Sequence, residues 1–175
     1  MEANYLAFGS IVLRPLEPDD IDILYSWENN TAIWEVSNTK APFSKHILAQ
    51  YIQESFKDIY STKQLRLVIE NLEGKPVGAI DLFDFEPFHQ RAGVGVLINS
   101  EEDRGKGYAS DALQALCNYG LNVLGLHQLY ANITADNESS LILFQKLGFE
   151  EVGIKKEWIR SLTEWKDEVM LQKFL

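Results

Sequence analysis

The sequence contains one cysteine, Cys117, and three histidines among its 175 residues. A single cysteine excludes a disulfide framework within the chain and a zinc cluster built from cysteines. His46, His89 and His127 are scattered along the chain and lack the spacing of metal ligands. We therefore expect a fold that depends on its hydrophobic core, with no bound metal.

Long apolar runs are also missing. No run approaches the roughly 20 apolar residues that a membrane-spanning helix needs. The first residues, Met1-Glu2-Ala3-Asn4, do not form the basic segment and apolar stretch of an export signal. These absences predict a cytoplasmic protein that contacts no membrane.

Positive charge is scarce. Lys and Arg number 16 against 26 Asp and Glu, which gives a formal net charge of −10 and a pI near 4.7. This balance argues against a nucleic-acid-binding surface. It suits a cationic partner, although an acidic balance also serves solubility alone. The sequence leaves open whether the chain forms a homo-oligomer.

Several segments have the pattern of β-strands. With 46% hydrophobic residues, the chain can build the core of one domain, whereas two domains would be cramped. The segments that alternate or are apolar like strands are 10–16, 65–70, 76–85, 92–98, 128–134, 149–154 and 168–174. Residues 71–75 predict a hairpin turn between two of them. We predict a single α/β domain over residues 1–175.

Helical spacing of apolar residues predicts helices between these strands. Asp19 and Asp20 stand near the start of the first helix, and Ser44 is the expected N-cap of a second one that continues to Ile59. Further helices are predicted after Gly107 and over residues 137–147. The stretch 29–43 is irregular and carries aromatic residues, so we interpret it as a loop on the substrate side.

A glycine-rich segment joins an apolar strand to a helix. The strand ends at Ile98, and Arg104-Gly105-Lys106-Gly107-Tyr108-Ala109 follows an acidic turn. Glycines let the main chain wrap an anion, and the helix N-terminus directs free N–H groups and its positive dipole end at the same place. Arg104 or Lys106 would add charge-assisted contacts. This arrangement predicts a pyrophosphate site; the alternative is a plain glycine turn without a ligand.

The same segment carries a resemblance to a known family. Arg104-x-x-Gly107-x-Ala109 matches the Arg/Gln-x-x-Gly-x-Gly/Ala pattern of the GNAT acetyltransferase superfamily. Three other segments are similar to the ribosomal-protein and spermidine acetyltransferase branch and follow in the family's order: Leu13-Arg14-Pro15-Leu16, Gln90 to Gly95, and Asn137 to Ser140 with Phe144 to Phe149. The chain therefore resembles an acetyl-CoA-dependent N-acetyltransferase.

The resemblance implies a fold and a cofactor site. The expected fold is a mixed, mostly antiparallel sheet of about six or seven strands, flanked by helices and splayed in the middle by a bulge in the Gly93/Gly95 strand. Acetyl-CoA is the implied co-substrate. Main-chain groups of residues 96–98 would bind its pantetheine arm, and N–H groups of residues 104–109 its pyrophosphate. The implied cofactor-binding residues are Val96, Leu97, Ile98, Arg104, Gly105, Lys106, Gly107, Tyr108, Ala109, Asn137 and Ser140, with Lys146 as a further candidate.

Some of these residues also have ordinary structural interpretations. Asn137 is a natural helix N-cap, and Lys146 is a typical solvated lysine near a helix end.

The family's catalytic side chains cannot be transferred to this chain. The spermidine branch has a tyrosine general acid where this chain has Phe144, and many relatives have a glutamate where it has Gly93. The catalytic groups are therefore unknown from the sequence. The candidates that remain are Asp81, Asp84, Glu101 and Tyr130, with His89 behind them; each has an alternative as a plain surface or core residue. His127 precedes an apolar strand and is interpreted as structural.

The implied reaction is acetyl transfer to a primary amine. We predict direct attack in a ternary complex, because Cys117 is the lone thiol and lies on the apolar face of its helix. A polyamine such as spermidine is the favoured acceptor. The alternatives are the N-terminal amine of a protein, as in ribosomal-protein acetyltransferases, or a CoA-binding module without catalysis.

Overall fold

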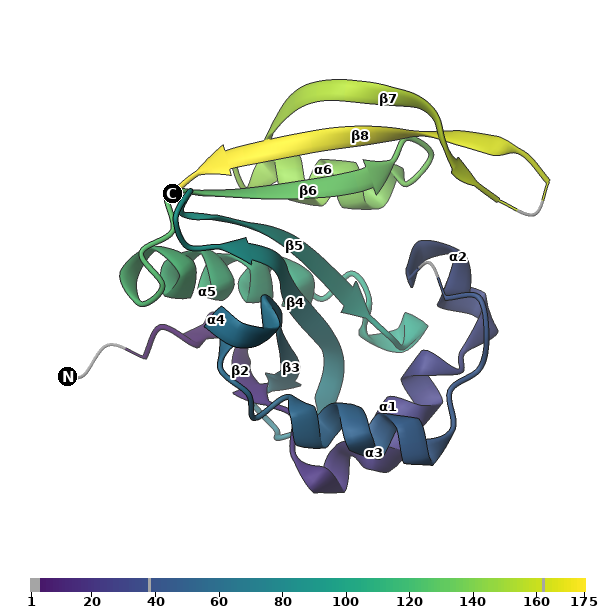
Figure 1. The fold of residues 1–175 in the computed structure, drawn as a ribbon, viewed down its shortest axis with the longest axis vertical. Coiled ribbons are helices and arrows are strands. Elements are labelled where there is room, and N and C mark those ends of the chain that lie inside the picture. The colour runs from purple at the N-terminus through teal and green to yellow at the C-terminus, as the bar shows by residue number, and fades with distance from the viewer. Residues whose placement is uncertain (1–3, 38, 162) are drawn as a thin grey trace.

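One mixed sheet organises the chain in the computed structural model, which describes residues 4–37, 39–161 and 163–175. The order of its eight strands is β1-β2-β3-β4-β5-β6-β8-β7 (Figure 1). The strands are β1 (Ala7–Phe8), β2 (Ile11–Pro15), β3 (Leu65–Asn71), β4 (Pro76–Glu86), β5 (Arg91–Ile98), β6 (Gln128–Thr134), β7 (Glu150–Arg160) and β8 (Trp165–Phe174). Neighbouring strands are antiparallel except for the parallel pair β5–β6. This confirms the predicted mostly antiparallel sheet, to which β1 adds an eighth strand too short to show a sequence pattern.

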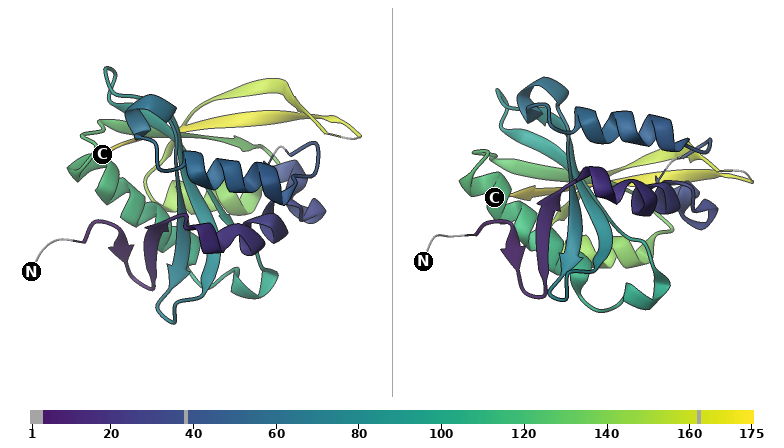
Figure 2. Two further views of the ribbon diagram at one scale, coloured as in Figure 1. Left: turned by 60° about the horizontal axis from the view of Figure 1, so that its bottom comes forward. Right: turned by 90° about the horizontal axis from the view of Figure 1, so that it is seen from below.

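Helices cover both faces of the sheet. They are η1 (Pro18–Asp20), α1 (Ile21–Glu28), η2 (Thr31–Ile33), α2 (Trp34–Ser37), α3 (Lys45–Glu54), α4 (Ile59–Thr62), η3 (Glu101–Asp103), α5 (Tyr108–Asn122) and α6 (Glu138–Lys146). Figure 2 shows α1 and α3 on one side of the central strands and α5 on the other. Within the described ranges, no helix is long and apolar enough to cross a membrane.

Strand β3 shows why two helical layers are needed. Successive residues of a strand point to opposite faces. Leu67 and Ile69 belong to the large core cluster that includes α5, whereas Val68 packs with Leu24 of α1 and residues of α3 in a second cluster. All three β3 side chains are almost completely buried. The run of apolar residues in this strand is therefore explained by burial on both sides.

Arg14, in the Leu13-Arg14-Pro15-Leu16 segment, fixes the entry into α1. Its guanidinium contacts Asp20 at 2.7 Å and Glu70 of β3 at 2.6 Å. Asp20 also accepts a hydrogen bond from the Glu17 main chain at 2.8 Å. The segment thus ties β2, η1 and β3 together.

The predicted second helix is shorter than its apolar spacing suggested. Ser44 is its N-cap, as predicted, with Oγ accepting from Ile47 N at 3.2 Å. The helix ends at Glu54 instead of Ile59, because Asp58 caps a separate short helix through Tyr60 N. The prediction of an irregular 29–43 stretch was also wrong in part. Asn30 accepts from Ala32 N and starts η2 and α2 there.

The C-terminal hairpin extends beyond both predicted strands. Strand β7 reaches Arg160 and β8 begins at Trp165. Charged residues in this part interrupt the apolar alternation, so the sequence pattern fades. In the structure they pair across the hairpin: Lys155 with Glu168, and Lys156 with Asp167. Cross-strand ion pairs thus extend the strands where apolar alternation does not.

The sheet splays between β5 and β6. These strands pair through Arg91–Gly93 and Gln128–Tyr130, and no pairing follows from Val94 onward. Figure 1 shows them diverging toward α2. The splay is as predicted, but the bulge lies in β4, between Phe83 and Glu86, and not in β5. Gly93 serves another purpose there: a Cβ at this position would lie 2.2 Å from the Phe83 ring. The ring occupies the space that a side chain would need.

Candidate functional site

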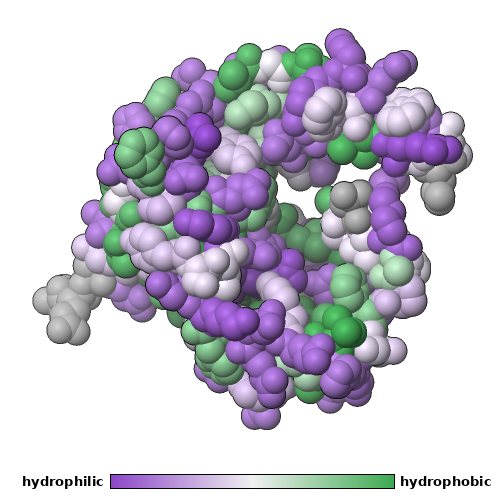
Figure 3. Space-filling view, viewed as in Figure 1, coloured by the Kyte–Doolittle hydropathy of each residue, from purple (hydrophilic) through white to green (hydrophobic). Residues whose placement is uncertain are grey.

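Two pockets meet at the splayed part of the sheet. The first is bounded by β5, the glycine-rich turn and α6, and has a volume of about 570 Å³; we call it the turn pocket. The second lies under α1 and α2 on the other side of β5, with about 210 Å³; we call it the acidic pocket. Ile33, Val36, Val96 and Leu97 line both pockets. Figure 3 shows the surface hollowed between the β6–β8 part and the α1–α3 part of the molecule.

The glycine-rich turn leaves the start of α5 open. Gly105 has φ +74° and Gly107, the N-cap residue of α5, has φ +88°, a range that favours glycine. No side chain caps the helix, and an added Cβ at either glycine would meet no atom within 4 Å. The first N–H groups of a 15-residue helix therefore face open space in the turn pocket.

Charged side chains hold this turn in shape. Asp103 is buried and accepts from Lys75 Nζ at 2.8 Å and from Lys106 Nζ at 3.1 Å. The hydrogen bond from Lys75 and that from Lys106 lower the pKa of Asp103. Arg104 donates through Nε to Ile98 O at 3.2 Å. Arg104 and Lys106 thus brace the turn itself, where the sequence suggested contacts to a phosphate.

The implied cofactor residues converge on one pocket. All of them line the turn pocket except Lys106, and Lys146 lines it as well. Asn137 is the N-cap of α6: its Oδ1 accepts from Ser140 N at 3.2 Å and from Ser139 Oγ at 3.1 Å. The capping interpretation of Asn137 is therefore confirmed, and it places Ser140 at the pocket wall.

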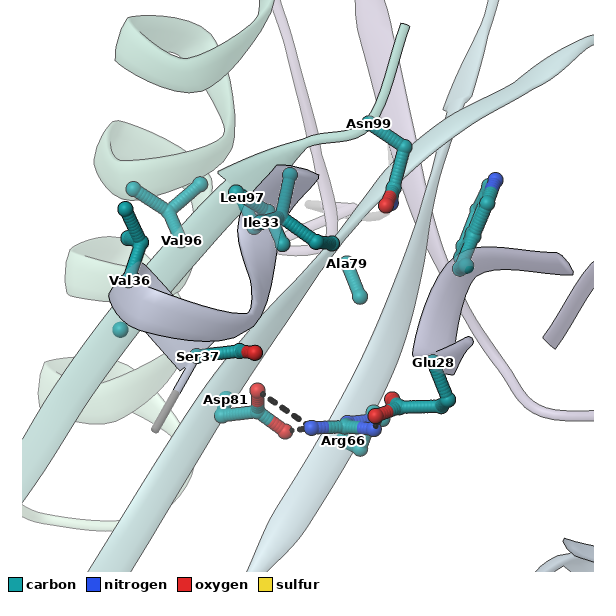
Figure 4. A pocket seen from close by; sticks show the side chains of 12 residues that line it. Glu28, Ile33, Val36, Ser37, Arg66, Ala79, Asp81, Val96, Leu97 and Asn99 are labelled. Atoms are coloured by element: carbon teal, nitrogen blue, oxygen red, sulfur yellow. Dashed lines mark hydrogen bonds and ion pairs between the residues drawn. The ribbon is translucent and has the colours of Figure 1, made fainter. Parts of the chain in front are cut away.

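A partly buried arginine between two carboxylates dominates the acidic pocket. Arg66 of β3 contacts Asp81 of β4 through Nε at 2.7 Å and Glu28 of α1 through Nη1 at 2.6 Å. A second bond, from Nη2 to Asp81 Oδ2 at 3.1 Å, makes the Asp81 contact bidentate (Figure 4). With one cation and two anions, the cluster keeps a net negative charge. Trp27 adds an aromatic surface to the same pocket.

Asn99 is a further polar group of the acidic pocket. Figure 4 shows its side chain directed into the pocket near Ala79. Its Oδ1 is the one buried side-chain oxygen or nitrogen without a hydrogen-bond partner in the part of the chain that the structure describes. A buried acceptor without a partner is costly unless something donates to it.

The catalytic candidates from the sequence are dispersed. Asp81 lines the acidic pocket, whereas Glu101 is exposed on η3, and neither Glu101 nor Tyr130 lines either pocket. Tyr130 donates to Asp84 Oδ2 at 3.0 Å, and burial, together with this carboxylate, raises the pKa of Tyr130 to about 12. Asp84 itself lies in the β4 bulge with φ +49°.

Phe144, His89 and His127 line neither pocket. Phe144 is buried and packs edge-on against Phe149, with ring centroids 4.9 Å apart. The His89 ring lies edge-on to Phe88, and the His127 ring is tilted against Phe174. The described residues hold no group of three His, Cys, Asp or Glu side chains arranged to bind a metal.

Two charged residues of the acidic pocket, Arg66 and Glu28, were not predicted from the sequence. Arg66 is the one charged residue within the apolar run 65–69, and Glu28 follows Trp27 at the end of α1. A lone charge inside a strand that is otherwise buried requires a partner. That signal was present at Arg66, but the sequence does not name the partner.

Comparisons with known proteins agree with this geometry. Residues 10–150 match the family described as acetyltransferase (GNAT) domain. Spermidine N(1)-acetyltransferase of Escherichia coli K12 is 30% identical over 144 residues, which cover 82% of this chain and 75% of that protein. The Vibrio cholerae spermidine N(1)-acetyltransferase is 25% identical over 83% of this chain and 82% of its own.

Solved structures share the fold. A spermidine N-acetyltransferase from V. cholerae, in complex with CoA and spermine, superposes with a TM-score of 0.85 at 22% identity. The superposition covers 94% of this chain and 95% of that one. The family match over residues 10–150, together with the relative that is 30% identical, establishes that the protein is an acetyltransferase of the GNAT family.

Proposed function

We propose that this chain, as a single acetyltransferase domain, transfers the acetyl group of acetyl-CoA to a primary amine of a polyamine such as spermidine. The observation that carries this proposal is the contact between the two pockets at Val96 and Leu97. A cofactor in the turn pocket and an amine in the acidic pocket would meet at this part of β5. Direct attack in a ternary complex then needs no intermediate on the enzyme.

The turn pocket fits the phosphates and the pantetheine arm of CoA. The glycine turn and the free N–H groups of α5 form an anion cradle. Strand β5 has a free edge beyond Gly93, where peptide-like amides can add as a further strand. Asn137, Ser140 and Lys146 face the same space from α6.

Only every second residue of β5 directs its main-chain N–H and C=O groups to the free edge of the strand. Asn99 N donates to Val77 O at 3.1 Å, so the main chain of Asn99 faces β4. Main-chain groups alternate in direction along a strand, so those of Leu97 face β4 as well. The close approach of Leu97 O to Gly78 of β4 agrees with this, since a Cβ on Gly78 would lie 2.2 Å from that oxygen. The groups of Val96 and Ile98 therefore face the opening. We assign the main-chain contacts to the pantetheine arm and to the oxyanion of the reaction to Val96, whereas the resemblance implied residues 96–98 together for the arm.

The acidic pocket fits a cationic amine. Glu28 and Asp81 supply negative charge, and Trp27 supplies an aromatic face for an ammonium group. A primary amine with a pKa of about 10.4 must lose a proton before it attacks. Arg66 donates hydrogen bonds to both carboxylate oxygens of Asp81. We therefore assign Asp81 to binding and orienting the amine rather than to abstracting its proton. When bound, acetyl-CoA supplies a thioester whose thiol, with a pKa of about 8.5, leaves readily.

We expect spermidine to be acetylated and its KM to rise with ionic strength. Added salt screens the attraction between the acidic pocket and a polycation. Initial rates are measured with a panel of amines, each at low and at physiological salt concentration. A peptide that offers its N-terminal amine and has uncharged side chains serves as the comparison. Turnover of the peptide without turnover of spermidine would favour the N-terminal acceptor. Binding of acetyl-CoA with no turnover of any amine would favour a CoA-binding module, as Phe144 and Gly93 suggest.

Replacing Cys117 by alanine is expected to leave kcat within about twofold of the original, because the thiol is buried in α5 and burial raises its pKa. A protonated, inaccessible thiol cannot carry an acetyl group. Initial-rate plots against both substrates should intersect. An inactive but folded Cys117→Ala protein with parallel plots would contradict direct transfer.

We also propose that the chain forms a homo-oligomer. A spermidine N-acetyltransferase from V. cholerae has been solved as a dodecamer. Strand β7 lies at the edge of the sheet and exposes Val152, Ile154 and Trp158, which supports an interface between copies.

A further inference from the structure

Segment 31–37, which comprises η2 and α2, forms the wall between the two pockets. Ile33 and Val36 line both of them. The segment has little packing of its own, since none of the four α2 residues is buried. Ile33 is buried, and Trp34 Nε1 donates to Glu28 O at 2.9 Å, which ties the start of α2 to the end of α1. These contacts do not join the segment to the β6–β8 part of the splayed sheet.

Lys166 of β8 supplies such a contact. Its Nζ lies 2.7 Å from Glu35 Oε1 of α2 and 2.6 Å from Asp136 Oδ2. Its side chain is 16% exposed, so this bridge is partly shielded from solvent. The two carboxylates, Asp136 first, raise the pKa of Lys166, so its charge persists throughout the neutral range.

The bridge spans the opening of the sheet. Glu35 belongs to the segment that covers the acidic pocket, whereas Asp136 immediately precedes Asn137, the N-cap of α6 at the turn pocket. Lys166 therefore joins the two sides between which the strands β5 and β6 diverge. Figure 1 shows α2 beside this opening, facing the β7–β8 hairpin.

We infer that Lys166 is a positioning residue for acetyl transfer, which acts through Glu35 to hold the shared wall of the two pockets. The inference rests on the proposed function, because it takes the turn pocket as the cofactor site and the acidic pocket as the amine site. With the bridge intact, Ile33 and Val36 are held against both substrates. Without it, α2 retains its tie to α1 but loses its tie to β8, and the wall of both pockets loosens.

The test variant is Lys166→Met, which keeps the length of the side chain and removes its charge. We expect the Kd for CoA, measured by isothermal titration calorimetry, and the KM for the amine each to rise about fivefold, the size expected for losing a partly shielded ion pair. The kcat at saturation should change by less than about twofold, because no group of the reaction is removed. Lys166→Arg should restore both values.

Two further variants sharpen the experiment. Glu35→Gln removes the carboxylate charge on α2 and should reproduce the effect, and the double variant Lys166→Met/Glu35→Gln should be no worse than either single one. If Lys166→Met does not fold, Glu35→Gln alone provides the test. Lys156→Met is the matched control, since it removes an ion pair with Asp167 in the same hairpin and should leave both constants unchanged.

The outcomes separate the inference from the proposed function. A parent protein that binds no CoA would overturn the assignment of the turn pocket itself. A parent protein that binds CoA, with Lys166→Met and Glu35→Gln equal to it in CoA affinity and amine KM, would overturn the positioning role alone. A lower melting temperature with unchanged constants would also overturn it, since the bridge would then be merely structural.

Discussion

Gly107→Glu is expected to lower the affinity for acetyl-CoA at least tenfold, about 1.4 kcal/mol. Gly107 opens α5 with φ +88°, a conformation that a side chain adopts only with strain. A carboxylate there would stand at the positive end of α5, in the space we assign to the pyrophosphate. Repulsion between the carboxylate and the pyrophosphate lowers the affinity, and the carboxylate also blocks the N–H groups that would bind the pyrophosphate. Titration calorimetry with acetyl-CoA measures the loss.

Gly125→Glu is the matched control for this change. Gly125 also has positive φ, +64°, and an added Cβ there would meet no atom within 4 Å. It follows α5 at the other end and lines neither pocket. Backbone strain should therefore lower the stability of both variants, while CoA affinity falls in Gly107→Glu alone. Equal affinities in the two folded variants would remove the pyrophosphate assignment.

The elements that could be predicted are those with local causes. The Gly107 turn, the Ser44 cap and the Asn137 cap each depend on a few neighbouring residues, and the structure has all three. Apolar alternation located seven strands in the same way. The helical spacing of apolar residues failed where polar contacts decide the end of a helix. The Asp58 cap, which separates α4 from α3, is the example. Apolar alternation failed in β7, because ion pairs to β8 replace apolar burial in the outer part of this strand.

The acidic pocket could not be assembled from the sequence. Glu28, Arg66 and Asp81 come from three different elements, and only the pairing register places them together. In that register, Arg66 stands directly opposite Asp81 on β3 and β4. A shift by one residue would point Arg66 to the other face of the sheet. Asp81 was a catalytic candidate from the sequence, but its pairing with Arg66, which decides the role we assign to it, required the fold.

The position of the β4 bulge also depends on packing. Glycines in β5 suggested a bulge there, yet the extra residue lies in β4, and Gly93 makes room for Phe83. Glycine in a strand indicates either a bulge or a close approach of another group. The sequence contains both glycines and the aromatic ring but not the contact between them. Which of the two causes applies was decided by packing.

Arg66→Met is expected to lower the free energy of unfolding by about 3 kcal/mol and to raise the amine KM at least tenfold. Removing one member of a buried ion cluster leaves the others desolvated and unpaired, which costs about 3–5 kcal/mol when burial is complete. The Arg66, Asp81 and Glu28 side chains are about one fifth exposed, so the lower end applies. Without the guanidinium, Glu28 and Asp81 repel each other and lose the orientation that binding an amine requires. Urea unfolding and initial rates measure the two effects.

A double variant separates stability from function. Arg66→Met with Asp81→Leu removes the buried pair as a unit, and replacing such a pair by apolar side chains is often neutral. Glu28 then remains alone, at the edge of the pocket with partial access to water. We expect the double variant to regain most of its stability in urea but to keep the raised KM for spermidine, because the pocket has lost a carboxylate. Its affinity for acetyl-CoA should stay close to that of the unmodified protein, since none of the three residues lines the turn pocket. If the double variant regained amine turnover together with stability, the cluster would serve the fold alone, and the acceptor would have to bind elsewhere.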